Sequence, residues 1–409
     1  MNVVSGDRLW IKDTPIPKQY KYLDSNIECD VAVIGAGVIG ALCAFHFAEA
    51  GLHTVLVDRG VAGYLSTSAS TAILQYEVDT DLIGLGGMIG MEKATQSFKL
   101  FEKAVYDIEK IIKGFDNKCE FRTRQSLYYS FNPGDIDYMR REFELRKAGG
   151  LNVEFIDRAA AQKLFSFRVE AGILSHSGAG DINPYAFCHE LISNAEEKSA
   201  QIFENTEIIK LEPSSSSVVL TTNIDRKIRA RKVVIASGYE AVRLIREKIA
   251  SFSRTFTIAT SPVKSFNGWP NQCIIRDNRS AYNYLRTSFD SRILMGGEDV
   301  DLGSRNSNIA LLKNMDKFVS ERYCLLENKL KSYFPAIDDI KAEYAFNGIF
   351  GTTKDGLPYI GEHSKYPNCY FSLCYGSNGI VYGVLAAQLI RDMIVGKTPR
   401  ESELFRFGR

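Results

Sequence analysis

Histidine is scarce in this chain, with only five residues among 409. The nearest approach to the zinc-binding pattern HExxH is His189 followed by Glu190, and the fifth position of that stretch is Ser193. The eight cysteines form no CxxC pair. The sequence therefore predicts no metal site. Its cysteine usage is typical of a protein that is kept reduced in the cytoplasm.

An excess of charge of one sign is also lacking. Fifty Lys and Arg residues stand against 49 Asp and Glu residues, which leaves a net charge of +1. No overall field would therefore attract nucleic acid or acidic lipid. One basic run, from Arg226 to Lys232, alternates with apolar residues as an exposed strand edge or turn would. We expect no nucleic-acid partner, because the nucleic-acid signature needs more than one short patch.

A membrane-spanning run is missing, although one segment resembles it. Residues 31–52 are nearly uncharged, but three glycines among the first ten, together with His46 and Glu49, argue for a strand, a turn and a buried helix. The first residues, MNVVSGDRLWIKDTP, lack the apolar core of a secretory signal. We expect no membrane span and a cytoplasmic location.

What the sequence has is the composition of a globular protein of two or three domains, with 45% hydrophobic and 24% charged residues. Hydrophobic periodicity predicts its main elements. The predicted strands include residues 30–34, 54–57, 218–222, 233–236, 280–286, 292–296 and 370–373. The predicted helices run from the turn after residue 34 to 49 and cover 92–113, 136–147, 183–198, 306–333 and 380–395.

The first strand, turn and helix carry a nucleotide-binding motif. Gly35 allows a sharp turn, Gly37 allows the backbone to approach a pyrophosphate, and Gly40 allows the helix to pack close to the strand. The helix amino terminus offers free N–H groups to the phosphates. Asp58 ends the second strand, 18 positions after Gly40, where its carboxylate can accept both ribose hydroxyls. An acid at this position also repels the 2′-phosphate of NADP.

Four blocks of sequence in a fixed order resemble the D-amino-acid oxidase family of flavoenzymes, which includes glycine oxidase, sarcosine oxidase and γ-glutamylputrescine oxidase. They are IECDVAVIGAGVIGALCAFHFAEAGLHTVLVDRG with the hydroxyl-rich loop Ser66–Thr71, then RKVVIASGYEA, GTTKDGLPYIG and CYGSNGIVYG. The resemblance covers about residues 30–397. It implies an α/β fold, with a Rossmann-like FAD-binding domain and an interwoven α+β substrate domain that carries a mainly antiparallel sheet.

The resemblance also implies which residues contact FAD. They are Gly35, Gly37, Gly40, Asp58, Ser66, Thr67, Ile208, Gly238, Tyr375, Gly376, Ser377, Asn378, Gly379 and Ile380. The last helix would direct its dipole at the flavin, where negative charge accumulates on reduction. The position of the flavin-linked cysteine in sarcosine oxidase falls on Gly348, and the hydroxyl loop has no histidine, so we expect noncovalent FAD.

In this family the flavin takes a hydride from the carbon next to an amine, and water hydrolyses the imine. Relatives that oxidise amino acids hold the substrate carboxylate with cations, but the corresponding positions here are neutral: Phe350, Ser377, Ala72 and Val381. An unpaired buried carboxylate is costly. We therefore expect a small amine without an α-carboxylate as substrate, unless Arg286 or another cation reaches in from a different direction.

The candidates for the substrate pocket are Glu77, Tyr284, Arg286 and Phe350. Glu77 could pair with an amine, or it could be a solvated loop carboxylate. Tyr284 and Arg286, with Tyr282, lie on the strand that should face the substrate, where core or surface packing is the alternative. The electron acceptor is O₂ or an unidentified carrier. The oxygen-activating lysine of sarcosine oxidase falls on Leu294, which slightly favours the carrier.

Because the FAD motifs lie at both ends and in the middle of the chain, the substrate elements must be insertions. We expect an FAD-binding domain of residues 1–80, 151–243 and 344–409, and a substrate domain of residues 81–150 and 244–343. Three alternatives stay open. The chain could be an amino-acid oxidase or dehydrogenase, an NAD-linked dehydrogenase, or a flavoprotein with a role in assembly or RNA modification.

Overall fold

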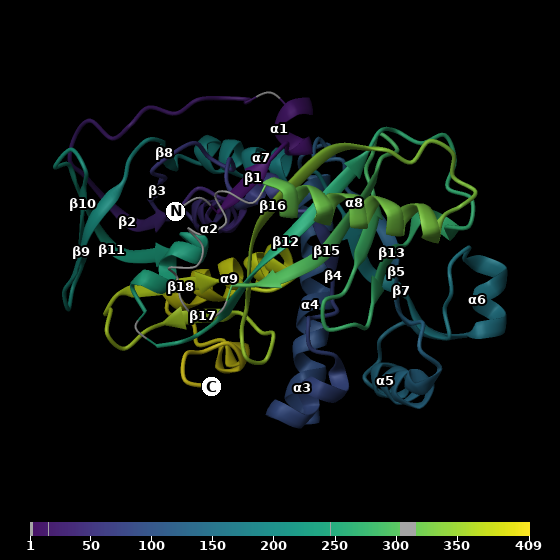
Figure 1. Cartoon of the computed structure of the whole chain (residues 1–409). Coiled ribbons are helices and arrows are strands. Elements are labelled where there is room, and N and C mark those ends of the chain that lie inside the picture. Colours follow the sequence, from purple (N-terminus) through teal and green to yellow (C-terminus); the bar gives the residue numbers. More distant parts are fainter. Residues whose placement is uncertain (1–2, 15, 246, 303–315) are drawn as a thin grey trace.

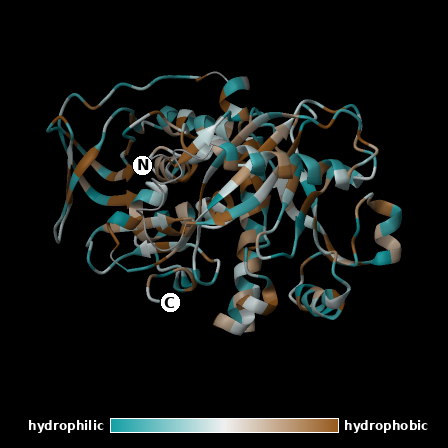
Figure 2. Cartoon of the chain, viewed as in Figure 1, coloured by the Kyte–Doolittle hydropathy of each residue, from teal (hydrophilic) through white to brown (hydrophobic). Residues whose placement is uncertain are grey.

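A computed structural model describes residues 3–14, 16–245, 247–302 and 316–409. Two large β-sheets lie side by side, with helices on their outer faces and between them (Figure 1). Hydrophobic residues concentrate on the strands and on the inner helices, whereas the loops are mostly hydrophilic (Figure 2). Among the described residues, no helix is long and apolar enough to cross a membrane.

The first sheet has eight strands and is mostly parallel. Its main path runs β17-β18-β11-β2-β3-β8, and β11 continues into an antiparallel ribbon with β10 and β9. The strands β18, β11, β2, β3 and β8 are parallel to one another, and β17 is antiparallel to β18. The bounds are β2 Ile27–Ile34, β3 Thr54–Val57, β8 Gln201–Phe203, β9 Ile208–Pro213, β10 Val218–Thr222, β11 Lys227–Ile235, β17 Tyr359–Glu362 and β18 Cys369–Leu373.

Three buried helices pack on this sheet, with α2 between the other two: α2 Val38–Glu49, α7 Pro184–Glu197 and α9 Gly379–Ile394. Nearly every residue of α2 is buried because α7 and α9 both contact it. This explains why residues 31–52 carry so little charge, and it confirms the predicted strand, turn and buried helix.

The second sheet has ten strands and is mainly antiparallel. Its order is β1-β16-β12-β15-β14-β13-β5-β7-β4, with β6 paired to β7, and among the described strands of this sheet only β13 and β5 are parallel to each other. The bounds are β1 Val4–Gly6, β4 Ile73–Gln75, β5 Arg122–Ser130, β6 Val153–Asp157, β7 Ala171–Asp181, β12 Ser251–Thr260, β13 Ile274–Asp277, β14 Tyr284–Thr287, β15 Ile293–Asp301 and β16 Ala342–Thr352.

The remaining helices surround the second sheet. Helix α8 packs on β12 and β15, and α4 contacts both β7 and α9, so it joins the two sheets. Ile293 and Met295 share a core cluster with Leu326 and Leu330 of α8. The bounds are α1 Leu9–Asp13, α3 Leu82–Ile89, α4 Met91–Lys113, α5 Ile136–Ala148, α6 Arg158–Leu164 and α8 Asp316–Tyr333.

The predicted α/β fold with a Rossmann-like part is confirmed, and most predicted elements agree with the structure. Two differ. The strand expected from residue 280 begins at Tyr284, because residues 280 and 281 lie in a turn. The basic run lies in β11, which pairs on both sides and is no sheet edge; its charged residues alternate along one face. Of the helix expected over 306–333, residues 306–315 lie outside the described residues.

Five strands do not pair in the sheet that we expected from the predicted domain boundaries. The division placed β1, β4, β6, β7 and β16 wholly or largely with the FAD-binding part, but all of them pair within the ten-stranded sheet. Residues 151–243 therefore contribute to both sheets, with the change after β7. The assignment of two functional domains stays a prediction; by sheet pairing, these five strands belong with the strands of the predicted substrate domain.

Candidate active site

A cavity of about 530 Å³ lies between the two sheets. Ile34, Val57 and Ile235, the last residues of β2, β3 and β11, line it, so it opens at the carboxyl edge of the parallel strands. This is where open α/β sheets bind their ligands. Residues of β12, β13, β14 and β15 line the cavity from the second sheet.

The glycine turn between β2 and α2 is shaped as its motif predicts. Gly35 has φ of +106°, a conformation that favours glycine. A Cβ on Gly40 would lie 1.7 Å from the carbonyl oxygen of Gly35, so only glycine lets the helix begin here. Gly35 and Gly37 line the cavity; Gly40 does not, because it provides the close packing behind them.

Asp58 lies at the end of β3 and faces this turn. Its Oδ2 accepts a hydrogen bond from the Ala36 N–H (2.7 Å), and its Oδ1 accepts one from the Gly60 N–H (2.8 Å). Burial raises the pKa of Asp58, and these two bonds oppose that rise. Each carboxylate oxygen keeps a second lone pair, so the group can still accept hydroxyl donors from the cavity that it lines.

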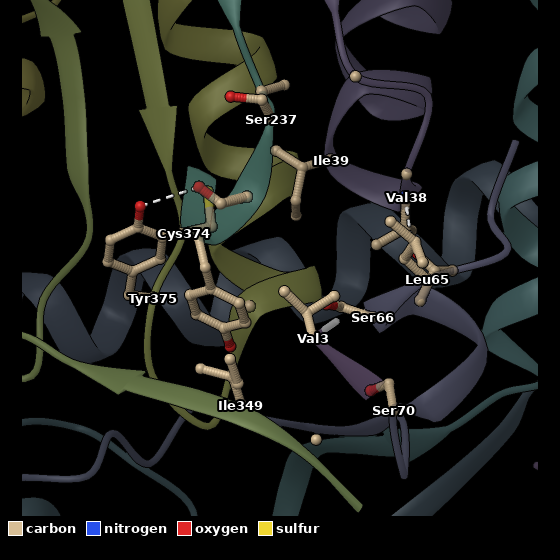
Figure 3. A pocket seen from close by; sticks show the side chains of 18 of the residues that line it. Val3, Val38, Ile39, Leu65, Ser66, Ser70, Ser237, Ile349, Cys374 and Tyr375 are labelled. Carbon is tan, nitrogen blue, oxygen red and sulfur yellow. Dashed lines mark hydrogen bonds between the residues drawn. The ribbon is translucent and has the colours of Figure 1, made fainter. Parts of the chain in front are cut away.

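The hydroxyl-rich loop forms a short 3₁₀ turn, Ser66–Ala69, beside the start of α2. Thr67 Oγ1 accepts a hydrogen bond from the Val38 N–H at 3.0 Å. Figure 3 shows Val38 and Ser66 on one side of the cavity, with Cys374 and Tyr375 on the other. The loop is therefore fixed to the helix amino terminus, where a phosphate would bind.

The turn before α9 closes the cavity from the other side. Gly376 has φ of +111°, and a Cβ there would lie 3.1 Å from Oδ2 of Asp79. The Tyr375 hydroxyl donates to the Gly238 carbonyl (2.9 Å). Ser377 Oγ and Asn378 Oδ1 are buried and have no hydrogen-bond partner among the described residues. These orphaned polar atoms beside a helix amino terminus suit a polar ring system placed in the cavity.

On the second sheet, a row of paired residues crosses the neighbouring strands and contributes to the cavity floor. Thr257, Gly296, Tyr284 and Arg276 are successive partners on β12, β15, β14 and β13. A Cβ on Gly296 would lie 2.2 Å from the Tyr284 ring, so the ring lies directly over this glycine. Tyr284 and Phe350, two of the candidates for the substrate pocket, both line the cavity.

Glu77 does not line the cavity, although it was a candidate for binding the amine. It is 2% exposed, and its Oε1 lies 3.2 Å from Arg146 Nη1. Oε1 also accepts hydrogen bonds of 3.0 Å from the hydroxyls of Ser126 and Ser175. The candidate role was therefore wrong, and so was the alternative of a solvated loop, because the carboxylate is committed to a buried network.

Arg286 is not a substrate clamp either. Its guanidinium donates to the carbonyl oxygens of Ala72 (3.1 Å) and Ile182 (3.0 Å), and it lies 3.8 Å from Asp181. It is 1% exposed and does not line the cavity. Burial lowers the pKa of Arg286 to about 10. Its partners are protein groups, so its role is structural.

A different arginine enters the cavity. Arg276 on β13 lines it and is only 5% exposed. Its Nη1 donates to the Val78 carbonyl (3.0 Å), and the guanidinium lies 5.0 Å and 5.1 Å from the rings of Tyr128 and Tyr282. No carboxylate of the described residues lies within the 4.0 Å of an ion pair with it.

Two further acids at this end of the cavity were missed as site residues. Asp79 accepts hydrogen bonds from the Tyr282 hydroxyl (2.8 Å) and from the Ser377 N–H (3.1 Å), so it connects the loop before β14 to the turn before α9. Asp299 on β15 lines the cavity itself. The signal for Asp79 is its position shortly after the hydroxyl-rich loop, which it shares with Glu77, and the signal for Asp299 is the pair Gly296-Gly297 just before it.

Comparison with known proteins agrees with this geometry. Residues 30–393 match the model of the family described as FAD dependent oxidoreductase. The γ-glutamylputrescine oxidoreductase of Escherichia coli is 24% identical over 92% of this chain and 86% of its own length, and a glycine oxidase of Bacillus licheniformis is 26% identical over 90% and 93%. The crystal structure of L-proline dehydrogenase from P. horikoshii superposes with a TM-score of 0.77 at 18% identity, covering 93% of this chain and 97% of that one.

The chain belongs to this family of FAD-dependent oxidoreductases, as the sequence predicts. The cavity fits the cofactor. Thirteen of the fourteen residues expected to contact FAD line it, and the fourteenth, Gly40, packs directly behind them. Asp58 and the Gly35 turn would hold the adenosine and pyrophosphate, Ser66 and Thr67 the chain, and the turn before α9 the flavin ring.

Proposed function

We propose that this protein oxidises the C–N bond of a small amine, whose imine is then hydrolysed by water. FAD, when bound, supplies the hydride acceptor. The observation that supports the proposal is that one cavity is lined both by Asp58, at the nucleotide-binding end, and by Tyr284 and its neighbours on the second sheet. The protein's part is to hold the amine nitrogen and its neighbouring carbon beside the flavin, in a space that excludes bulk water.

A second candidate is favoured by Arg276. Of the four clamp positions expected to be neutral, Phe350 and Ser377 line the cavity, whereas Ala72 and Val381 do not. These residues alone would argue against a carboxylate. The buried guanidinium of Arg276, which has no ion-pair partner among the described residues, supplies the missing cation in the same cavity from a different direction. This observation supports a substrate that carries both an amine and an acid group, which corresponds to the alternative of an amino-acid oxidase or dehydrogenase.

For the electron acceptor we propose a carrier in preference to O₂. The supporting observation is that Leu294, at the position of the oxygen-activating lysine, is fully buried in a cluster with Trp10 and Tyr185 and supplies no lysine there. Arg276, a cation that does line the cavity, is assigned above to the acid group of a substrate. The measurement is the rate of reoxidation after anaerobic reduction. Reoxidation that is rapid in air and unaffected by artificial acceptors would reverse this assignment.

The experiment that tests the function is anaerobic bleaching of the flavin. The FAD-loaded protein is mixed with matched pairs of amines and amino acids, for example ethylamine with D- and L-alanine, and methylamine with glycine. We expect at least one amine-containing compound to bleach the 450 nm band within seconds. If none of a broad set of amines and amino acids does so, a flavoprotein without an amine substrate is the better description.

A further inference from the structure

The strand β15 contains a bulge where it faces β12. Arg254 pairs with Val300 and Phe256 pairs with Gly297, so Thr255 alone faces both Glu298 and Asp299. Glu298 has φ of +56°, a left-handed conformation that is uncommon for a residue other than glycine. Bulges of this kind redirect side chains and are frequent beside active sites.

This bulge decides which acid enters the cavity. Ile293 and Met295 face the core cluster under α8, and Leu294 faces the opposite side. Strict alternation would continue this pattern and place Asp299 on the α8 side. Instead Glu298 faces α8, where it forms ion pairs with Arg322 (3.2 Å) and Lys329, and Asp299 lines the cavity.

Asp299 reaches the cavity without a cationic partner. Its Oδ1 is buried and has no hydrogen-bond partner, and no Lys or Arg among the described residues lies within ion-pair distance of it. A buried carboxylate without a counter-ion is costly, so the site is arranged to receive a positive charge from a ligand. Burial raises the pKa of Asp299 to about 6, although the Thr255 hydroxyl opposes that rise.

The other acids that line the cavity lie near its nucleotide-binding end. Asp58 belongs to the glycine turn, Glu240 forms an ion pair with Arg59 at 2.8 Å, and Glu207 immediately precedes Ile208. Asp299 is the only cavity-lining acid on the described part of the second sheet. There it shares the floor with Tyr284, which extends from the neighbouring strand toward Thr255; the two hydroxyls lie 3.3 Å apart.

We propose that Asp299 is the binding residue for the positively charged nitrogen of the substrate, and that the bulge at Glu298 exists to deliver it. The inference rests on the proposed oxidation of an amine and names the group that selects for it. With Arg276 two strands away, the floor offers one anionic and one cationic group. The cavity would therefore select a substrate with an ammonium at Asp299 and, for the amino-acid branch, an acid at Arg276.

The test compares Asp299→Asn with Glu298→Gln in the FAD-loaded protein. The second variant removes a negative charge from the same bulge but on the α8 side, so it is a matched control. Tetramethylammonium, a permanent cation that cannot be oxidised as an amine, is titrated while the flavin absorption spectrum is recorded. We expect the Kd to rise by at least about tenfold in Asp299→Asn, because the coulombic attraction between the cation and the carboxylate is lost, and to stay unchanged in Glu298→Gln.

This readout separates the inference from the function that it rests on, because cation binding needs no turnover. Binding that depends on Asp299 while no amine reduces the flavin would reject the proposed function and retain the cation site. An equal Kd in the wild type and Asp299→Asn, an equal loss in Glu298→Gln, or no spectral response in the wild type would overturn the inference. Asp299→Glu should restore part of the affinity, and Asp299→Ser replaces the asparagine variant if that variant does not fold with FAD.

Discussion

The Nη1 atom of Arg146 lies 3.2 Å from Oε1 of Glu77, and both side chains are buried between α5 and the second sheet. The same guanidinium forms a second ion pair, of 2.8 Å, with Glu142. Removing one member of a buried ion pair leaves an uncompensated charge and is strongly destabilising.

We expect Glu77→Ala to lower the free energy of unfolding by about 3 kcal/mol, the lower end of the range for a broken buried pair, because Glu142 still neutralises Arg146. Urea unfolding of the FAD-loaded protein measures this. Glu109→Ala, which breaks a largely exposed pair with Lys113, should cost less than about 1 kcal/mol. A Glu77 variant that keeps its stability but loses amine binding would return Glu77 to the substrate site.

Asp58 should hold FAD through its ribose. In Asp58→Ala, the lost hydrogen bonds to a charged acceptor are worth about 1.5 to 3 kcal/mol each, so the affinity for FAD should fall at least about tenfold. Fluorescence titration of the apoprotein with FAD measures the change. Asp30→Ala is the control, because Asp30 also accepts a backbone N–H, from His53, but does not line the cavity. Unchanged FAD affinity in the Asp58 variant would contradict the assignment.

FAD should be bound noncovalently. Among the described residues that line the cavity there is one cysteine, Cys374, and no histidine. Burial raises the pKa of Cys374 to about 12, so little of it is the reactive thiolate at neutral pH. Denaturation in acid should release the whole of the flavin into the supernatant, as measured by its absorbance. Flavin that stays with the precipitated protein would refute the prediction.

Arg276 should distinguish substrates with an acid group from those without one. Arg276→Met removes the unpaired guanidinium, so the Kd of an amine that carries a carboxylate should rise about ten- to hundredfold, the worth of one charge-assisted hydrogen bond. The Kd of the matching amine without the carboxylate should change little. Anaerobic flavin reduction at several ligand concentrations measures both values.

The comparison variant is Arg286→Met. Arg286 donates to two backbone carbonyls outside the cavity, so its loss should lower stability without changing the ratio of the two affinities. If Arg276→Met weakens both ligands equally, Arg276 shapes the cavity but does not recognise the acid. The substrate would then be a simple amine, as Phe350 and Ser377 suggest.

The nucleotide half of this site could be predicted from sequence because each requirement is local. A Cβ on Gly40 would clash with the backbone, and Asp58 must follow a short parallel strand. The sequence motif alone therefore predicts the geometry of this part. The substrate half depends on long-range register. Arg276 and Tyr284 meet through strand pairing, and Asp299 enters only because a bulge reverses the alternation of β15. Glu77 was misjudged for the same reason, since its partner Arg146 is 69 residues away in the sequence.

The titration of Asp299 gives a final prediction. Burial, with smaller contributions from Asp79 and Glu298, raises the pKa of Asp299 to about 6, above the ordinary value of about 3.9. The carboxylate is therefore charged at pH 7 and becomes neutral as the pH falls through 6. Tetramethylammonium keeps its charge at every pH, so its affinity should be highest above pH 7. It should weaken as the pH falls from 7 to 5 and level off near the affinity of Asp299→Asn, in which this group is neutral at every pH.

The contribution of Asp299 to the free energy of unfolding should change with pH in the opposite direction to cation affinity. A carboxyl whose pKa is higher in the folded than in the unfolded state binds more protons when the protein is folded. Its stabilising contribution to the free energy of unfolding is therefore fully present below about pH 4 and is lost as the pH rises through about 6. In Asp299→Asn, the free energy of unfolding should no longer show this decrease as the pH rises through about 6, and cation binding should no longer depend on pH in this range. Glu298→Gln should leave the pH dependence of cation binding in place, because Glu298 faces Arg322 and Lys329. A pH profile of binding that persists in Asp299→Asn would show that another group carries the titration, with Asp79 the next to test.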